Sequence, residues 1–205
     1  MTSEAAAHWD AIYAAKTPDQ LSWTQATPAT SLRHLREAKL PSGARILDAG
    51  AGLGTLAQAI LRETDWSVTL VDLSAEALAK AEVRLGGPAR ADFRVGDLRT
   101  LDLPAAAYDA WHDRAVLHFL RAPADRAAYA AQVAKALKPG GVAVLAGFAP
   151  DGPETCSGLE VCRADAADLA ALLGPAFTLE ASEREVHLTP WGKDQAFVVA
   201  RFRKG

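Results

Sequence analysis

Apolar residues recur along the chain in short runs that alternate with longer, helically spaced stretches. Five runs have the length and apolar content of buried strands, at 45–49, 67–72, 92–95, 108–112 and 142–148. Stretches with apolar residues at helical spacing lie between and after them, at 55–63, 75–85, 115–120 and 125–137. Short apolar strands that alternate with helices predict a parallel sheet covered by helices on both faces.

Local signals indicate where some of these elements begin and end. Ser74 is expected to cap the helix at 75–85, because its hydroxyl can accept a hydrogen bond from a free backbone amide. Pro139 and Gly140 fit the two central positions of a type II turn. Such a turn would end the helix at 125–137 and lead directly into the next strand.

The two ends of the chain depart from the central alternation. Before residue 41 the spacing predicts two helices, one over 4–15 and one from Pro28 to Lys39 with Thr27 as its N-cap. After Pro150 the pattern predicts one more helix and an antiparallel hairpin, at 164–173 and at 177–187 with 195–203.

Composition limits the class of protein. The chain has 205 residues, of which 50% are apolar, so we expect one domain with a substantial core. The formal net charge is −3 and there is no basic run, which argues against a large nucleic-acid surface. No apolar stretch approaches a membrane span, and the N-terminus lacks a signal-peptide pattern. We expect a cytoplasmic monomer or homodimer with neither nucleic acid nor a membrane as partner.

The two cysteines do not indicate a cross-linked or metal-binding protein. Cys156 and Cys162 are expected to be free thiols, since a disulfide framework needs more cysteines than this chain has. A zinc site would also need paired close cysteines or nearby histidines. No metal site is therefore expected.

The most informative segment reads RILDAGAGLG over residues 45–54. A strand runs into Asp48 and then into three glycines, Gly50, Gly52 and Gly54, and a second strand ends in Asp72. A strand–helix–strand unit of this kind binds an adenosine-type cofactor. The glycines permit positive φ and a close approach of the backbone to the ligand. The acid at the tip of the second strand can accept hydrogen bonds from both ribose hydroxyls.

The spacing of the glycines separates two cofactor classes. A dinucleotide site usually reads G-x-G-x-x-G, whereas this loop reads G-x-G-x-G with Asp48 two residues ahead of it. A carboxylate there suits a ligand with an ammonium group better than one with phosphates. This segment resembles the first motif of the class I S-adenosylmethionine (SAM)-dependent methyltransferases. The resemblance implies that the loop holds the amino-acid tail of SAM and that Asp72 holds the ribose.

The resemblance extends over essentially the whole chain and implies an α/β fold. The fold would be a doubly wound, seven-stranded and mostly parallel sheet with a C-terminal antiparallel hairpin and an N-terminal helical lid. It would form a single domain over 1–205, with a lid at 1–40, a SAM-binding core at 41–150 and a substrate-side part at 151–205. The L-K-P-G-G stretch that ends at Gly141 also resembles the family's entry to its fifth strand.

Further cofactor contacts follow from the ends of the second and third strands. Leu73 adjoins Asp72, and the Gly96-Asp97-Leu98 stretch resembles the family's adenine contact. The resemblance places Asp97 and Leu98 at the adenine. The alternative for Asp97 is a turn or cap residue. Trp23 lies between the two N-terminal helices, where its indole would either attract the sulfonium of SAM or anchor the lid.

Four polar or ionisable groups follow one another at the tip of the fourth strand. By position, His112 and Asp113 should border SAM, and both are candidates for a general base together with His118. The W-x-D-R stretch resembles that of thiopurine S-methyltransferases. Arg114 would either bind substrate or form an ion pair with Asp113 or Asp109 that fixes the turn.

The sequence favours a SAM-dependent methyltransferase with a small-molecule acceptor, possibly a thiol or another soft nucleophile. One alternative is a methyltransferase acting on protein lysine, because the W-D-x-x-Y stretch from Trp9 to Tyr13 also occurs in some of those enzymes. Remote alternatives are a nicotinamide-dependent oxidoreductase and a module that binds SAM without turnover.

Overall fold

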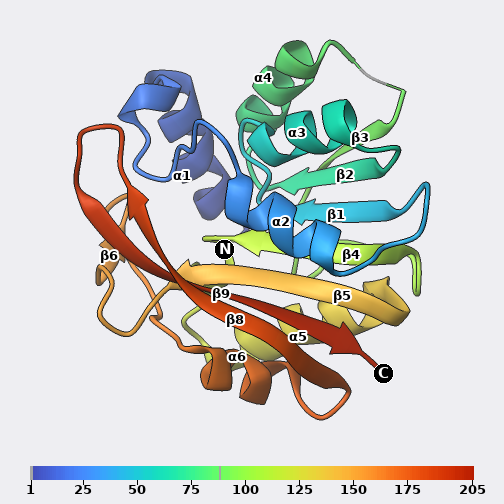
Figure 1. Cartoon of the computed structure of the whole chain (residues 1–205). Helices are drawn as coiled ribbons and strands as arrows, with labels where there is room; N and C mark the ends of the chain where they lie inside the picture. Colours follow the sequence, from blue (N-terminus) through green and yellow to red (C-terminus); the bar gives the residue numbers. More distant parts are fainter. Residues whose placement is uncertain (1, 88) are drawn as a thin grey trace.

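The computed structural model describes residues 2–87 and 89–205, and a seven-stranded sheet forms its centre (Figure 1). The strand order is β3-β2-β1-β4-β5-β9-β8. The first five strands in this order are parallel to one another, and β9 is antiparallel to both β5 and β8. This is the predicted doubly wound sheet with a C-terminal hairpin. The strands are β1 (Arg45–Ala49), β2 (Ser67–Asp72), β3 (Ala91–Val95), β4 (Tyr108–Arg114), β5 (Leu137–Phe148), β8 (Phe177–Leu188) and β9 (Asp194–Lys204).

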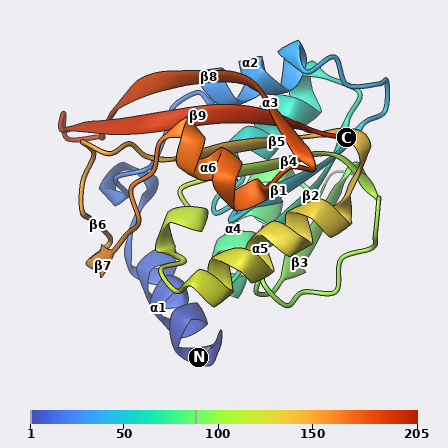
Figure 2. The same ribbon diagram turned by 90° about the horizontal axis from the view of Figure 1, so that it is seen from below.

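Helices cover both faces of the sheet, because its central strands are apolar on both sides (Figures 1 and 2). One core layer lies under α2 (Ala29–Glu37), α3 (Thr55–Glu63) and α4 (Ala75–Leu85). The other lies under α5 (Pro123–Ala136) and α6 (Ala166–Leu173). The first helix, α1 (Thr2–Ala15), packs on α4 and lies beyond the carboxyl ends of the parallel strands.

Several elements form as predicted from the local sequence pattern. The first two strands and the helices at 55–63 and 75–85 have the predicted bounds. Ser74 caps α4, since its Oγ accepts a hydrogen bond from the Ala77 amide at 3.0 Å. The helix at 4–15 is present within α1. The hairpin is present as β8 and β9, and both cysteines are free thiols.

Two helix predictions were wrong. α2 begins at Ala29 with Pro28 in the N-cap position and no side-chain cap, so Thr27 does not cap it. The expected helix at 115–120 is only a 3₁₀ turn, η2 (Leu117–Phe119). Its start is set by Asp113, whose carboxylate accepts hydrogen bonds from the amides that follow it, while Ala115 has a φ of 69°.

The predicted turn at Pro139–Gly140 is part of a strand. β5 already begins at Leu137, and its pairing with β4 shifts register between Tyr108 and Ala110. Gly140 keeps the φ of 76° that the second central residue of a type II turn requires. Within the described residues, no helix combines the length and the run of apolar side chains needed to cross a membrane.

Candidate functional site

A cavity of about 420 Å³ opens at the carboxyl ends of the parallel strands, the edge where open α/β sheets bind ligands. Its volume lies within the usual range of small-molecule sites. Walls come from α1, from the segment between α1 and α2, and from the loops that follow β1, β2, β3 and β4. The short strands β6 (Thr155–Cys156) and β7 (Leu159–Glu160) contribute Cys156 and Leu159.

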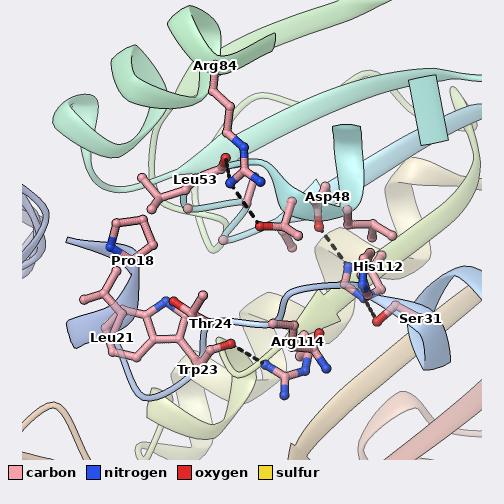
Figure 3. Close-up of a pocket in the computed structure, with 18 of the residues that line it drawn as sticks. Pro18, Leu21, Trp23, Thr24, Ser31, Asp48, Leu53, Arg84, His112 and Arg114 are labelled. Carbon is pink, nitrogen blue, oxygen red and sulfur yellow. Dashed lines mark hydrogen bonds and ion pairs between the residues drawn. The ribbon is translucent and has the colours of Figure 1, made fainter. Parts of the chain in front are cut away.

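A smaller hollow of about 100 Å³ adjoins the cavity (Figure 3). The two share Tyr13, Trp23, Gly50 and Arg114 in their walls. Asp48 lies at one side of the hollow, next to His112, and Trp23 lies at another. Together the two spaces form a continuous site along the loop that follows β1.

Asp72 is the buried acid at the centre of the larger cavity. One carboxylate oxygen accepts a hydrogen bond from the Gly52 amide and the other from the Ser74 amide, each at 2.9 Å. Burial raises the pKa of Asp72 to about 6, although these two amides pull it down. Each oxygen keeps a second lone pair, so the carboxylate can still accept two hydrogen bonds from a ligand. Leu73 lies beside it in the same wall.

The glycine loop has the predicted backbone conformation. Gly50, Gly52 and Gly54 have φ values of 65°, 52° and 70°. The close approaches, however, are to protein side chains. A Cβ on Gly50 would lie 2.0 Å from Val116, and a Cβ on Gly52 would lie 2.7 Å from the Tyr13 hydroxyl. Gly50 and Gly52 line the site, while Gly54 lies outside its lining, caps α3 and packs against α4.

Asp48 lines the smaller hollow and is held by His112. The Nδ1 atom of His112 lies 2.8 Å from the Asp48 carboxylate, and Nε2 lies 2.9 Å from the Ser31 hydroxyl (Figure 3). Because the carboxylate accepts, Nδ1 donates the hydrogen bond to Asp48, while Nε2 is engaged by the Ser31 hydroxyl. His112 thus joins β1, β4 and α2, and both of its ring nitrogens are engaged inside the protein.

Asp113 lies behind the cavity wall and does not line it. It is fully buried, and its carboxylate accepts hydrogen bonds from the Tyr129 hydroxyl at 2.5 Å and from the Val116 and Leu117 amides. The Trp111 indole in turn donates to the Tyr129 oxygen at 2.9 Å. Burial raises the pKa of Asp113 to about 6. This network shapes the turn after β4.

His118 lies apart from the other two candidate bases. It borders a separate cavity of about 20 Å³ together with Phe148 and Cys162. Among the described residues neither ring nitrogen has a hydrogen-bond partner. Burial, and then the charge of Arg114, lower the pKa of His118 to about 3. The ring is therefore neutral at physiological pH.

Asp97 and Leu98 line the large cavity at its far end, as predicted for the adenine contact. The Asp97 carboxylate already receives hydrogen bonds from the Arg99 side chain at 2.5–3.0 Å, and Arg99 also pairs with Asp125 at 2.6 Å. Burial raises the pKa of Asp97, but the Arg99 hydrogen bonds outweigh it and leave the value below the usual range. A ligand amine would share this carboxylate with Arg99.

The W-D-x-x-Y residues fasten α1 over the site. Asp10 accepts hydrogen bonds from the Ser74 hydroxyl at 2.6 Å and from the Glu76 amide at 3.2 Å. Trp9 and Tyr13 line the large cavity, and each packs edge-on against Trp23, with ring centroids 5.9 and 6.2 Å apart. Trp23 therefore faces the site and anchors the segment that covers it.

Arg114 forms neither of the ion pairs expected of it. Its guanidinium donates to the Trp23 carbonyl at 3.1 Å, lies 3.5 Å from the Glu185 carboxylate and stacks 4.5 Å from the Phe197 ring centroid. Asp109 instead pairs with Lys138 and accepts from the Arg45 amide. Arg114 is thus a partly buried cation in the wall of both cavities.

Comparisons with known proteins agree with this geometry. Residues 46–141 match the family model of the methyltransferase domain. The chain is 28% identical to the 1,6-didemethyltoxoflavin-N1-methyltransferase of Burkholderia thailandensis, solved with 1,6-didemethyltoxoflavin and S-adenosylhomocysteine bound. That match covers 100% of this chain and 90% of the other, with a TM-score of 0.75. In the matched segment and in its fold, the chain is similar to the class I SAM-dependent methyltransferases.

Two further proteins match this chain, one over its fold and one over part of its sequence. One solved structure concerns the conversion of a disulfide bond into a thioacetal group during echinomycin biosynthesis. It has a TM-score of 0.78 at 21% identity, and the match covers 98% of this chain and 92% of that one. The 2-methyl-6-phytyl-1,4-hydroquinone methyltransferase of Synechocystis is 29% identical over 108 residues, or 52% of this chain. That match spans 33% of the Synechocystis protein. The resemblance to thiopurine S-methyltransferases stays a prediction.

SAM is the cofactor of this methyltransferase family, and the residues present fit it. Asp72 offers two free acceptor sites to a ribose, and Asp48 offers a carboxylate to an ammonium group in the adjoining hollow. Asp97 and Leu98 line the same cavity as Asp72.

The pKa of Asp72 gives a pH dependence. Below about pH 6 the carboxylate takes up a proton, so we expect SAM affinity to rise by up to about tenfold between pH 5 and pH 7. The free energy of unfolding depends on pH in the opposite direction. A carboxyl group whose pKa is raised by folding stabilises the protein at low pH, and this contribution is lost as the pH rises towards about 6. Calorimetric titrations with SAM at several pH values measure the first effect. In Asp72→Asn the affinity should no longer follow this titration.

Proposed function

We propose that this chain transfers the methyl group of SAM to a small-molecule acceptor, for which a thiol or another soft nucleophile is one candidate. The observation that carries the proposal is the single cavity that joins Asp72 and Asp97 to the turn after β4. When bound, SAM supplies an activated methyl group on a sulfonium whose thioether leaves readily. Trp9, Phe119 and Leu159 line the cavity as apolar surface for an acceptor.

We assign the cofactor contacts by position. Asp72 and Leu73 would hold the ribose, Asp97 and Leu98 the adenine, and Asp48 the ammonium group of the methionine tail. Gly50 and Gly52 would form the floor of the cofactor site, and Trp23 would cover the bound cofactor. Gly54 and Asp113 support the loops rather than touch the cofactor, since neither lines the cavities.

The protein contributes alignment rather than a general base. Both ring nitrogens of His112 are engaged, Asp113 is sealed behind the wall, and His118 borders a different cavity. We therefore propose positioning roles for His112 and Asp113 in place of catalytic ones. An acceptor held in line with the methyl group gains most of its rate from proximity.

Relatives support a small acceptor. The toxoflavin enzyme is named for a small heteroaromatic compound and the Synechocystis enzyme for a hydroquinone. No observation favours protein lysine, because Trp9 to Tyr13, which suggested it, serve to dock α1 and to line the site. We also propose that residues 1–40 act as the lid, 41–150 as the cofactor-binding core and 151–205 as the substrate-side part.

Labelled SAM tests the proposal directly. The full chain is incubated with methyl-labelled SAM and a panel of small thiols, phenols and amines, and calorimetry measures SAM, S-adenosylhomocysteine and NAD binding. We expect label on a small molecule and binding of the two sulfur nucleosides. Label that appears only on polypeptide would reject the small-molecule acceptor, and binding of NAD alone would reject the methyltransferase.

His118→Phe separates a structural histidine from a base. The substitution removes two unpartnered buried nitrogens and extends into the adjoining 20 Å³ space, so we expect a gain of about 1 kcal/mol in the free energy of unfolding. The methyl-transfer rate should stay within about twofold. Thermal unfolding and initial rates measure both. A rate at least tenfold lower in a folded variant would restore His118 as a base.

A further inference from the structure

Arg114 lines the large cavity beside the turn after β4 and also borders the smaller hollow. Its side chain is 11% exposed, and its neighbours Cys156, Glu185 and Phe197 belong to β6, β8 and β9. In the sheet, β4 separates this side from β1, β2 and β3, which carry the cofactor contacts. The guanidinium thus borders the large cavity from the side of β6, β8 and β9, and it also borders the hollow that contains Asp48.

We propose that the acceptor is a flat, largely apolar molecule that binds as an anion, with an ionised sulfur, oxygen or ring nitrogen held against Arg114. This inference rests on the proposed methyltransferase function and names its substrate class. Trp9, Trp23 and Phe119 would pack against the flat body. Trp9 lies edge-on to both other rings, with centroids 5.9 and 5.1 Å away, so the three present an aromatic wall.

The hydrogen bonds of Arg114 leave room for such an anion. Among the described residues, two contacts engage the guanidinium: Trp23 carbonyl with Nη1 and Glu185 with Nη2. A guanidinium carries five N–H donors. The Glu185 contact is long, at 3.5 Å, and Glu185 also accepts from Gln25 at 3.2 Å. Burial lowers the pKa of Arg114 despite the attraction of Glu185, so the cation is only partly compensated.

Three further titratable groups near Arg114 are neutral at physiological pH. Burial raises the pKa of Cys156 to about 11, so it stays a thiol. Burial and the charge of Arg114 lower the pKa values of His187 and His118. Among the described residues, Glu185 is the carboxylate that pairs with Arg114. An anionic acceptor would be attracted to the guanidinium, whereas an ammonium acceptor would be repelled by it.

An anionic acceptor also explains a site without a base. The acceptor loses its proton to solvent before it reacts, and its lone pair forms the new bond to the methyl carbon. The carbon–sulfur electron pair remains on the departing thioether, so the cation and the anion give two neutral products. Arg114 increases the ionised fraction of the bound acceptor and needs no proton of its own to move.

Matched probes test this at saturating S-adenosylhomocysteine. We use 4-nitrophenol, whose visible colour reports its ionisation, and 4-nitrobenzylamine, a cation of similar shape. We expect 4-nitrophenol to bind at least about tenfold tighter than the amine, with a bound pKa lowered by about one unit. Arg114→Gln should abolish the pKa shift and weaken 4-nitrophenol binding about tenfold, measured at an S-adenosylhomocysteine concentration that saturates the variant.

Glu185→Gln is the matched control. It keeps the oxygen that accepts from Gln25 but removes the competing charge, so it should lower the pKa of bound 4-nitrophenol further. If Arg114 and Glu185 had only a structural role, the two substitutions would not shift the pKa of bound 4-nitrophenol in opposite directions. The proposal fails if 4-nitrophenol does not bind, if the amine binds as tightly, or if Arg114→Gln binds 4-nitrophenol as tightly as the wild type does. Failure of the wild type to bind S-adenosylhomocysteine would reject the methyltransferase function itself.

Discussion

Asp72→Ala should weaken SAM binding by at least about tenfold. The substitution would remove the two charge-assisted hydrogen bonds that we propose Asp72 makes to the ribose, each worth about 1.5 kcal/mol or more. It also leaves the Gly52 and Ser74 amides without their acceptor, so the glycine loop loses the contact that fixes it to the tip of β2. Calorimetric titration with SAM measures the loss.

Asp92→Ala provides the control, because Asp92 is an exposed acid on the neighbouring strand β3 and lines neither cavity. Its SAM affinity should match that of the wild type. Equal affinity in wild type and a folded Asp72→Ala would show that Asp72 does not hold the ribose. A loss in both variants would point to a general effect of charge rather than to a contact.

Gly50→Ala should be the most damaging single-methyl change at the site. The new Cβ would lie 2.0 Å from a Val116 methyl group, on a backbone with a φ of 65°. Overpacking and the left-handed conformation together cost about 3 kcal/mol. We expect the midpoint of thermal unfolding to fall by at least about 6 °C. SAM affinity should fall by at least about tenfold, because Gly50 lies in the walls of both cavities.

Two further variants separate the causes of this loss. Gly43→Ala has a similar φ of 67°, but its Cβ would meet no heavy atom within 4 Å, so only the backbone penalty applies and SAM binding should persist. Val116→Ala combined with Gly50→Ala removes the colliding methyl groups and should recover the steric part of the stability loss. Equal damage in Gly43→Ala and Gly50→Ala would contradict the steric argument.

The residues that line the cavities beside β1, β2 and β3 were predictable because their signals are local. Asp48, the glycines and Asp72 lie within one strand–helix–strand unit, and the need for positive φ selects glycine at fixed spacing. Asp97 and Leu98 follow the next strand, so the rule that ligands bind at strand ends placed them in the cavity. The hairpin followed from two long strand-like segments joined by a turn.

Residues whose roles depend on distant partners were not predictable. His112 looked like a free base, but Ser31 and Asp48 occupy its ring nitrogens from other elements. His118 lies in a 3₁₀ turn instead of the expected helix, and its side chain borders a separate cavity. Tyr13 carried no signal that its hydroxyl would lie against Gly52.

The sequence by itself determined the order of strands and helices, the conformation of the glycine loop and the acids around it, because each depends on neighbours in the chain. Only the tertiary structure decided the acceptor side. Arg114 could have paired with Asp109 or Asp113 beside it; folding instead brought Trp23, Glu185 and Phe197 to it from three distant segments. A buried charge takes whatever partners the packing supplies, and no local spacing encodes them.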